Sequence, residues 1–166
     1  MVTIRKAVIQ DLPDLVEIYN QSVLNNTATF DLNPVTVEQR RQWFDLHDQN
    51  ELYPLLVAER EGKAAGYASL SIFREKEAFK STSEISIYID KDQQGHGIGN
   101  QLMTAILELA KELDYHVIMA GITKGNDISI KMHEKFGFQF CGELKEVGRK
   151  FGEWQSVLFY QLTFDN

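Results

Sequence analysis

Apolar residues near the start of the chain recur at helical spacing and predict two helices. The first begins after Asp11, whose side chain can cap it, and runs to about Asn20. Its apolar stripe consists of Leu12, Leu15, Ile18 and Tyr19. The segment Thr36-Val37-Glu38-Gln39 has the spacing of a capping box and predicts a second helix, which runs to about Leu46.

Alternating and apolar-rich segments predict strands. Thr3–Ala7 predicts a first strand. Leu55–Glu59 and Lys63–Phe73 predict two more, and Arg60-Glu61-Gly62 is a plausible hairpin turn between them. The segment Glu84–Ile89 alternates strictly, so three isoleucines share one face of a strand. The opposite face carries Glu84, Ser86 and Tyr88.

The second half of the chain alternates between strands and helices. The expected elements are a helix at Ile98–Leu113, a strand at His116–Ile122, a helix at Asn126–Phe136 and strands at Phe138–Leu144 and Gln155–Thr163. The whole order, β-α-α-β-β-β-α-β-α-β-β, predicts an α/β or α+β fold in which helices pack on a sheet. No repeat, low-complexity tract or linker interrupts residues 1–166, so a single domain is expected.

Composition and charge narrow the choice of partners. The 166 residues are 43% hydrophobic and 25% charged, with a formal net charge of −7. An acidic chain without a long Lys/Arg cluster suits neither nucleic acid nor an anionic membrane surface. No apolar run approaches the roughly 20 residues of a membrane span, and the N-terminus has no secretory pattern. Because Cys141 is the only cysteine, no internal disulfide can form, which favours a cytoplasmic location. A small, diffusing substrate is the simpler partner.

A glycine-rich loop, Gln93–Asn100, lies between a predicted strand and a predicted helix. Its glycines allow a tight turn that gathers N–H groups, and the helix dipole adds positive charge, so the loop can seat a pyrophosphate. A P-loop is excluded because Gly99 is followed by Asn100-Gln101 rather than by Lys-Ser/Thr. The G-x-G-x-G spacing that begins at Gly95 also fails the dinucleotide fingerprint. The alternative is a turn that binds nothing.

The predicted helix at Asn126–Phe136 brings polar side chains onto one face. Asn126 and His133 are seven residues apart, which is two helical turns, and they share that face with Ser129. Asn126 can simply cap the helix, and a lone histidine is commonly a structural residue. His133 can also donate a proton near neutral pH.

These two segments resemble motifs of the GNAT superfamily of N-acetyltransferases. Gln94-x-x-Gly97-x-Gly99 resembles the Q/R-x-x-G-x-G/A signature, whose loop holds the pyrophosphate of coenzyme A. Nearly the whole chain is similar to one branch, the phosphinothricin, methionine sulfone and methionine sulfoximine N-acetyltransferases. The matching stretches are Thr27–Phe30, Tyr53–Glu59, Glu84–Ile89, Lys131–Glu134 and Gly148–Trp154.

The resemblance implies a site for acetyl-CoA, the acetyl donor, and for an amine acceptor. The implied cofactor-binding residues are Ile87, Tyr88, Ile89, Gln94, Gly95, His96, Gly97, Ile98, Gly99, Asn100, Asn126 and Ser129. The implied acceptor-side residues are Phe30, Arg74, Glu75, Lys76, Glu84, Ile85 and Ser86. The segment Gly148–Trp154 is expected near the active-site mouth or a subunit interface, because the branch is typically dimeric.

The same resemblance implies a mixed, mostly antiparallel sheet of about seven strands flanked by about four helices. The implied reaction is direct attack, in a ternary complex, by the amine of a small amino-acid-like substrate. Glu84 matches the branch's proposed general base, and a base is needed because only a neutral amine has a free lone pair. His133 matches the position that protonates the departing thiolate; many superfamily members carry Tyr there, and His is common in this branch. Arg74 can grip the α-carboxylate of the acceptor with two parallel bonds.

Other functions stay open at this point. A protein acetyltransferase, a non-catalytic acetyl-CoA-binding module and an interaction domain all fit the same chain. Glu84 can be an exposed strand-end carboxylate, and Arg74 and Lys76 can be solvated loop charges. No metal is expected, because the four histidines are scattered without the spacing of metal ligands.

Overall fold

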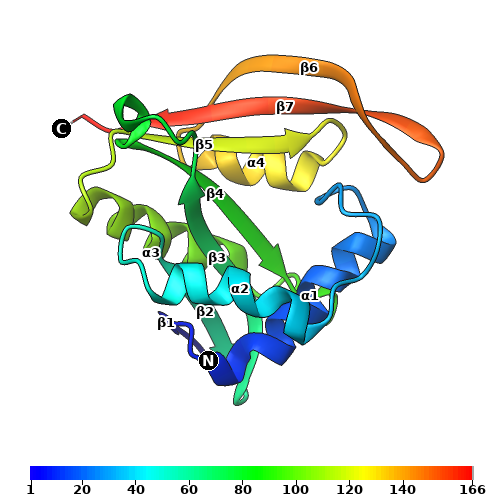
Figure 1. Cartoon of the computed structure of the whole chain (residues 1–166), viewed down its shortest axis with the longest axis vertical. Helices are drawn as coiled ribbons and strands as arrows, with labels where there is room; N and C mark the ends of the chain where they lie inside the picture. The colour runs from blue at the N-terminus through cyan, green and yellow to red at the C-terminus, as the bar shows by residue number, and fades with distance from the viewer. Residues whose placement is uncertain (166) are drawn as a thin grey trace.

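A seven-stranded sheet forms the centre of the protein, as a computed structural model that describes residues 1–165 shows (Figure 1). Its strands are β1 (Val2–Lys6), β2 (Leu55–Arg60), β3 (Lys63–Ile72), β4 (Thr82–Ile89), β5 (Val117–Thr123), β6 (Gln139–Lys150) and β7 (Glu153–Thr163). They lie in the order β1-β2-β3-β4-β5-β7-β6. Only β4 and β5 run parallel among these strands. The predicted mixed, mostly antiparallel sheet is therefore confirmed.

Helices cover both faces of this sheet (Figure 1). They are α1 (Leu12–Asn25), α2 (Val37–Asp48), α3 (Ile98–Glu112) and α4 (Asp127–Lys135). On one face, α1 and α2 pack on side chains such as Val57 and Tyr67. On the other face, α3 packs on Leu56 and Ala68, which point the opposite way from the same strands. None of the helices in residues 1–165 has the length and apolar character that a membrane crossing requires.

Local sequence signals account for several of these elements. The whole apolar stripe of α1 is buried. Thr36 and Gln39 form the predicted capping box, in which Thr36 Oγ1 accepts from the Gln39 N–H at 3.1 Å. Glu61 and Gly62 both have positive φ, 53° and 78°, as a two-residue hairpin turn between β2 and β3 requires.

Two elements extend well beyond their predicted ends. Helix α1 continues to Asn25 rather than Asn20, because Val23 extends its buried stripe by one more turn. Strand β6 continues to Lys150 rather than Leu144, and with β7 it forms a hairpin that extends past the sheet (Figure 1). The residues added to β6 are mostly polar and exposed, so no apolar pattern marks them.

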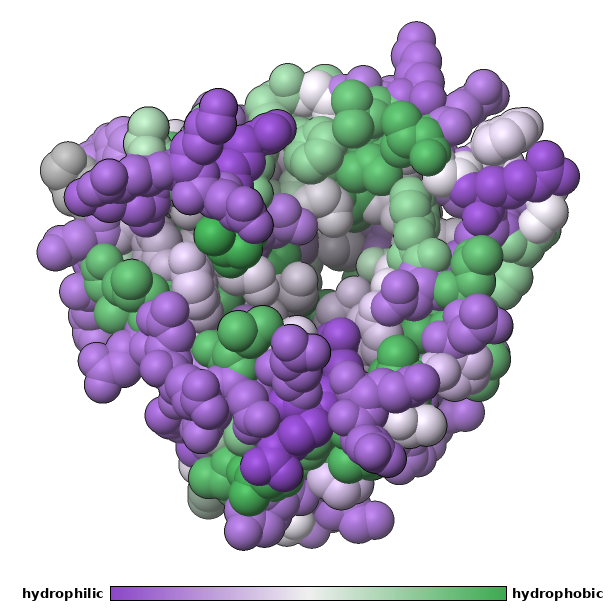
Figure 2. Space-filling model, viewed as in Figure 1, coloured by the Kyte–Doolittle hydropathy of each residue, from purple (hydrophilic) through white to green (hydrophobic). Residues whose placement is uncertain are grey.

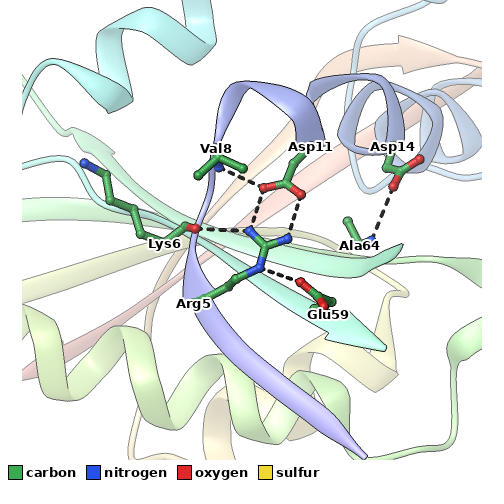
Figure 3. Close-up of polar contacts among 7 residues, drawn as sticks. All are labelled: Arg5, Lys6, Val8, Asp11, Asp14, Glu59 and Ala64. Carbon is green, nitrogen blue, oxygen red and sulfur yellow. Dashed lines mark hydrogen bonds and ion pairs between the residues drawn. The ribbon is translucent and has the colours of Figure 1, made fainter. Parts of the chain in front are cut away.

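Asp11 does not cap α1, contrary to the prediction. Its carboxylate instead accepts two bonds of 2.8 Å from the Arg5 guanidinium and one of 2.8 Å from the Val8 N–H (Figure 3). Arg5 also donates to Glu59 on β2 at 2.6 Å. Burial alone would raise the pKa of Asp11, but the bonds from Arg5 and Val8 outweigh it and lower that pKa. The Arg5 guanidinium therefore binds the Asp11 carboxylate in place of the helix N–H groups. This ion pair connects β1 to the start of α1.

Candidate active site

The two central strands, β4 and β5, separate partway along the sheet. They pair only at Thr82–Glu84 with Val117–Met119. Beyond that point β4 stays paired with β3, and β5 stays paired with β7, so the two halves of the sheet diverge. A cavity of about 1070 Å³ occupies the gap, and the molecule is hollowed near its centre (Figure 2). The sheet itself therefore creates a cleft with strands on either side.

The edge of β4 that faces the cleft carries unpaired backbone groups. In an antiparallel ladder, alternate residues direct both N–H and C=O to the same neighbour. The Asp90 N–H donates to Ala65 O on the β3 side at 2.9 Å. The backbone groups of Ile87 and Ile89 must then face the cleft, while those of Tyr88 face β3. Ile87 and Ile89 can therefore contact a ligand in the cleft through their backbone groups, as predicted for both. The backbone groups of Tyr88 cannot, although Tyr88 also lines the cavity.

The start of α3 provides a seat for an anion at one end of the cleft. Gly97 is the N-cap residue with φ +75°, and Gly95 has φ +83°. No side chain of the described residues caps this helix, so the N–H groups of residues 98–100 have no partner within the helix. A Cβ at Gly97 would meet nothing within 4 Å, so the space before these N–H groups is open. Helix dipole and free donors together suit a pyrophosphate.

The remaining residues of the glycine loop divide by position. Gln94, Gly95 and residues 97–100 line the cavity, whereas His96 is exposed and lies outside its lining. Gly99 allows α3 to approach α4, because a Cβ there would lie 2.9 Å from the sulfur of Met132. Close packing of α3 on α4 is therefore sufficient to explain Gly99, the third glycine of the motif, without a bound ligand.

Helix α4 brings Asn126, Ser129 and His133 to the same cavity. Asn126 caps the helix, with its side-chain oxygen accepting from the Ser129 N–H at 3.3 Å. His133 is 5% exposed, and its Nδ1 lies 2.7 Å from the Ser129 carbonyl oxygen. A carbonyl can only accept, so Nδ1 carries the proton and Nε2 is the free nitrogen. Burial lowers the pKa of His133 despite this bond, which keeps the ring neutral.

Glu84 stands where the two strands separate. It belongs to the last pair of the β4–β5 ladder, opposite Met119, and it lines the cavity with Ser86 and Tyr88. The side chain is half-buried, and burial raises the pKa of its carboxyl. A carboxylate with a raised pKa is a better proton acceptor near neutral pH than an ordinary one.

The structure places only some of the predicted acceptor-side residues at the cavity. Ile85 and Ser86 line the cavity as expected, but Phe30 and residues 74–76 do not. Phe30 packs behind the wall, where its ring leaves so little room that a Cβ on Gly148 would lie 2.6 Å from it. Arg74 is exposed, with its guanidinium 5.1 Å from the ring of Phe73.

Sequence reasoning had not assigned several other residues that line the cavity. The end of α1 and the loop after it line the cavity at residues 21–22 and 25–29, and Thr123 lines it from the end of β5. Part of the loop falls in the Thr27–Phe30 stretch that resembles the acetyltransferase branch. That stretch was the only available signal, because a loop has no periodicity to read.

Comparison with known proteins agrees with this geometry. The profile of the Acetyltransferase (GNAT) domain family matches residues 4–158. An L-methionine sulfoximine/L-methionine sulfone acetyltransferase from Pseudomonas aeruginosa is 42% identical over 98% of this chain and 95% of its own. The structure of a phosphinothricin acetyltransferase from Sinorhizobium meliloti, solved with acetyl-CoA, superposes with a TM-score of 0.93. It is 34% identical and covers 98% of this chain and 88% of its own.

A third relative carries a different description. The structure of a ribosomal-protein-alanine N-acetyltransferase from Brucella melitensis has a TM-score of 0.94 and is 44% identical, over 98% of this chain and 99% of its own. The two solved structures share the fold with this chain over most of their length. Together with the matching family profile and the divided central sheet, they show that the chain belongs to the GNAT acetyltransferase family.

Proposed function

We propose that this enzyme transfers the acetyl group of acetyl-CoA to the α-amine of a small amino-acid-like acceptor. Methionine sulfone, methionine sulfoximine and phosphinothricin are the leading candidates, as the descriptions of the Pseudomonas and Sinorhizobium relatives suggest. The observation that carries the proposal is the place of Glu84. It has a raised pKa and stands at the apex of a cleft that has backbone donors on one side and a side-chain wall on the other.

The donor side fits an extended thioester with an anionic end. The N–H groups of residues 98–100 would hold the pyrophosphate. The backbone groups of Ile87 and Ile89 would bind the amide-bearing arm, with Asn126 and Ser129 near its sulfur end. Bound acetyl-CoA supplies the activated acetyl group.

The chain's own groups then handle protons and charge. Glu84 takes the proton of the ammonium form of the acceptor, directly or through water, which frees the lone pair that attacks the acetyl carbon. An N–H group of Ile87 or Ile89 stabilises the negative charge that develops on the acetyl oxygen. His133 is the proposed proton donor to the leaving sulfur, through Nε2. Because its neutral form carries the proton on Nδ1, this role needs the imidazolium form, which a developing thiolate nearby favours.

A second candidate substrate is the α-amine at the N-terminus of a protein. The Brucella relative, described as acting on ribosomal-protein alanine, is the observation that favours it. Both candidate substrates would lose a proton to Glu84 in the same way. They differ in the group on the α-carbon, which is a free carboxylate in the amino-acid analogues and a peptide bond in the protein N-terminus.

One panel assay separates these proposals. Free coenzyme A would be measured with amino acids, their sulfone and sulfoximine analogues, phosphinothricin, polyamines and alanine-terminated peptides. We expect the amino-acid analogues to have the highest kcat/KM. Preference for the peptides would establish the second candidate, and preference for polyamines would contradict both. Stabilisation by acetyl-CoA with no coenzyme A release from any amine would indicate a non-catalytic module.

We further propose that the enzyme is a homodimer and works in the cytoplasm. Strand β6 is a 12-residue edge strand, and large apolar side chains are exposed along its hairpin with β7. They are Phe140, Leu144, Val147, Phe151 and Trp154. An edge of this kind is commonly covered by a partner chain. Light scattering should give twice the monomer mass, and Val147→Lys should reduce it to that of one chain.

The proposed cytoplasmic location rests on the single cysteine, which allows no internal disulfide. Cell fractionation tests it.

A further inference from the structure

Three successive carbonyls on the acceptor side are each held by a side chain from a different strand. They belong to residues 27–29, which we call the acceptor segment. Their donors, in order along the segment, are Thr123 Oγ1 on β5 at 2.6 Å, Tyr88 Oη on β4 at 3.4 Å and Lys150 Nζ on β6 at 2.8 Å. All three residues of the segment line the cavity.

The acceptor segment therefore bridges the opening of the cleft. Thr123 belongs to β5 and Tyr88 to β4, the two strands that separate. Tyr88 shares its face of β4 with Glu84, so the segment lies over the face on which the proposed base stands. An acceptor that reaches Glu84 from this face must pass the segment or contact it.

Lys150 differs from the other two donors because it is a buried charge. The side chain is 3% exposed, and its ammonium also donates to the Ser22 carbonyl oxygen, near the end of α1, at 3.2 Å. Among the described residues no carboxylate lies within ion-pair distance of it. Burying an ammonium is unfavourable unless other groups replace water, and the Ser22 and Thr29 carbonyl oxygens do so here. The negative charge of Asp31 and the ring of Phe151, 5.1 Å from the ammonium, add to this stabilisation.

The neighbouring contact shows how closely the same two regions are joined. Phe30, directly after the acceptor segment, packs against Gly148 of β6 so tightly that a Cβ there would lie 2.6 Å from its ring and force it to move. The end of the β6–β7 hairpin is thus attached to the segment by a charged hydrogen bond and by a packing contact two residues away. A hydrophobic residue in place of Lys150 would satisfy the packing but would leave the Thr29 carbonyl without this donor.

We propose that Lys150 is a positioning residue for the acceptor, because its ammonium holds the acceptor segment over the cleft in the form that the acceptor binds. The inference rests on the proposed function in that it places the acceptor between Glu84 and this segment. The β6–β7 hairpin then takes part in acceptor recognition without lining the cavity itself. The donor side, on α3 and α4, is independent of it.

The first test compares Lys150→Met with a matched control, Lys145→Met, which removes an exposed lysine from the same strand. In Lys150→Met the KM for the preferred acceptor should rise by about tenfold or more, with kcat changed by less than about threefold. Acetyl-CoA affinity, measured by calorimetry, should stay unchanged in both variants. Lys150→Arg retains the charge and the donors and should recover part of the loss. An unchanged acceptor KM in folded Lys150→Met, or an equal rise in Lys145→Met, overturns the proposal.

The second test does not depend on activity. Amide hydrogen exchange at residues 26–31 should accelerate in Lys150→Met, while exchange in α3 stays the same. This distinguishes the two proposals: if no acceptor is acetylated by the wild-type enzyme, the proposed function fails, but the exchange result still tests the attachment. Unchanged exchange at residues 26–31 overturns it.

A double-mutant cycle tests whether the donors act through one element. Thr123→Val removes the hydroxyl that donates to the Thr27 carbonyl. If both residues position the same segment, the double variant Thr123→Val/Lys150→Met should show non-additive effects on acceptor KM and on exchange. Strict additivity overturns the common role. If Lys150→Met does not fold, Thr123→Val alone must accelerate exchange at residues 26–31, and unchanged exchange there contradicts the proposal.

Discussion

The two sides of the cleft are built in different ways. The proposed donor side consists largely of backbone groups from short, continuous stretches: the β4 edge, the glycine loop and the starts of α3 and α4. The acceptor side depends on side chains that meet across the sequence, with Thr123 and Lys150 reaching the acceptor segment from 96 and 121 positions away. The difference suggests that backbone groups serve the ligand common to the family, whereas replaceable side chains shape the site for the variable one.

The helix starts show the same contrast on a smaller scale. Helix α2 has its capping box, and α4 has Asn126 as its cap. No described side chain caps α3, and glycine occupies its N-cap position. A helix end without a protein cap is the one that has donors to spare for an anion.

The largest effect is expected at Glu84, where the two sides meet. Glu84→Gln should lower kcat by roughly 10²–10⁴ while leaving acetyl-CoA affinity unchanged, because it removes the proton acceptor and keeps the shape. Burial raises the pKa of Glu84, so the wild-type rate should increase as pH rises through a value above that of an ordinary glutamate. The variant should lose this acidic limb. Glu108→Gln, on the exposed face of α3, serves as the control, and near-native turnover in Glu84→Gln would exclude it as the base.

A change confined to the donor side comes next. Gly97→Asp should weaken acetyl-CoA binding by roughly 10–10³-fold, because one added charge near a pyrophosphate costs about 1–4 kcal/mol. Calorimetry measures it. Gly97→Asn, which lacks the charge, should lose much less. Gly62→Asp carries the same charge at a similar φ of +78° in a distant turn and should bind normally. Equal affinities in all three variants would remove the loop from the donor site.

Arg74 offers a matching test on the acceptor side. The proposal that it grips the acceptor's carboxylate predicts that Arg74→Ala raises KM for amino-acid acceptors by roughly 10–150-fold, since a lost charged hydrogen bond costs about 1.5–3 kcal/mol. Acetyl-CoA affinity should not change. Lys80→Ala, another exposed cation of the same loop, is the control. A KM equal to that of the control would leave Arg74 with only its contacts to the rings of Phe73 and Phe79.

The smallest effect is expected at His133, and it appears mainly in the pH profile. Burial lowers the pKa of this histidine, so an acid role means that kcat falls as pH rises through a value below the ordinary 6.5. His133→Ala should remove this descending limb while lowering kcat near neutrality by less than about tenfold. His133→Gln, which can still donate to the Ser129 carbonyl, separates the hydrogen bond from the proton transfer. An identical profile in His133→Ala and the wild type would leave the side chain with a structural role.

Sequence reasoning succeeded where a signal is local. Helical spacing located the stripe of α1, and a four-residue motif located the start of α2. It failed where a partner outside the local pattern intervened: Arg5, six residues away, takes the Asp11 carboxylate, and pairing with β7 lengthens β6 beyond any apolar pattern. Among the site residues, the start of α4 and the glycine loop apart from His96 lie at the cavity, and their roles stay predictions.

The sequence alone determined the fold class, the family resemblance and the local features of the proposed donor side, because glycine conformation, capping and hydrophobic spacing act over a few residues. Tertiary structure decided three other features: the place of Glu84 at the last strand pair, the proton on Nδ1 of His133 and the attachment of the acceptor segment. Burial sets the pKa of both titratable groups, and burial depends on how the whole sheet and its helices pack. The acceptor wall depends on contacts between residues 60 to 121 positions apart along the chain, which no local pattern encodes.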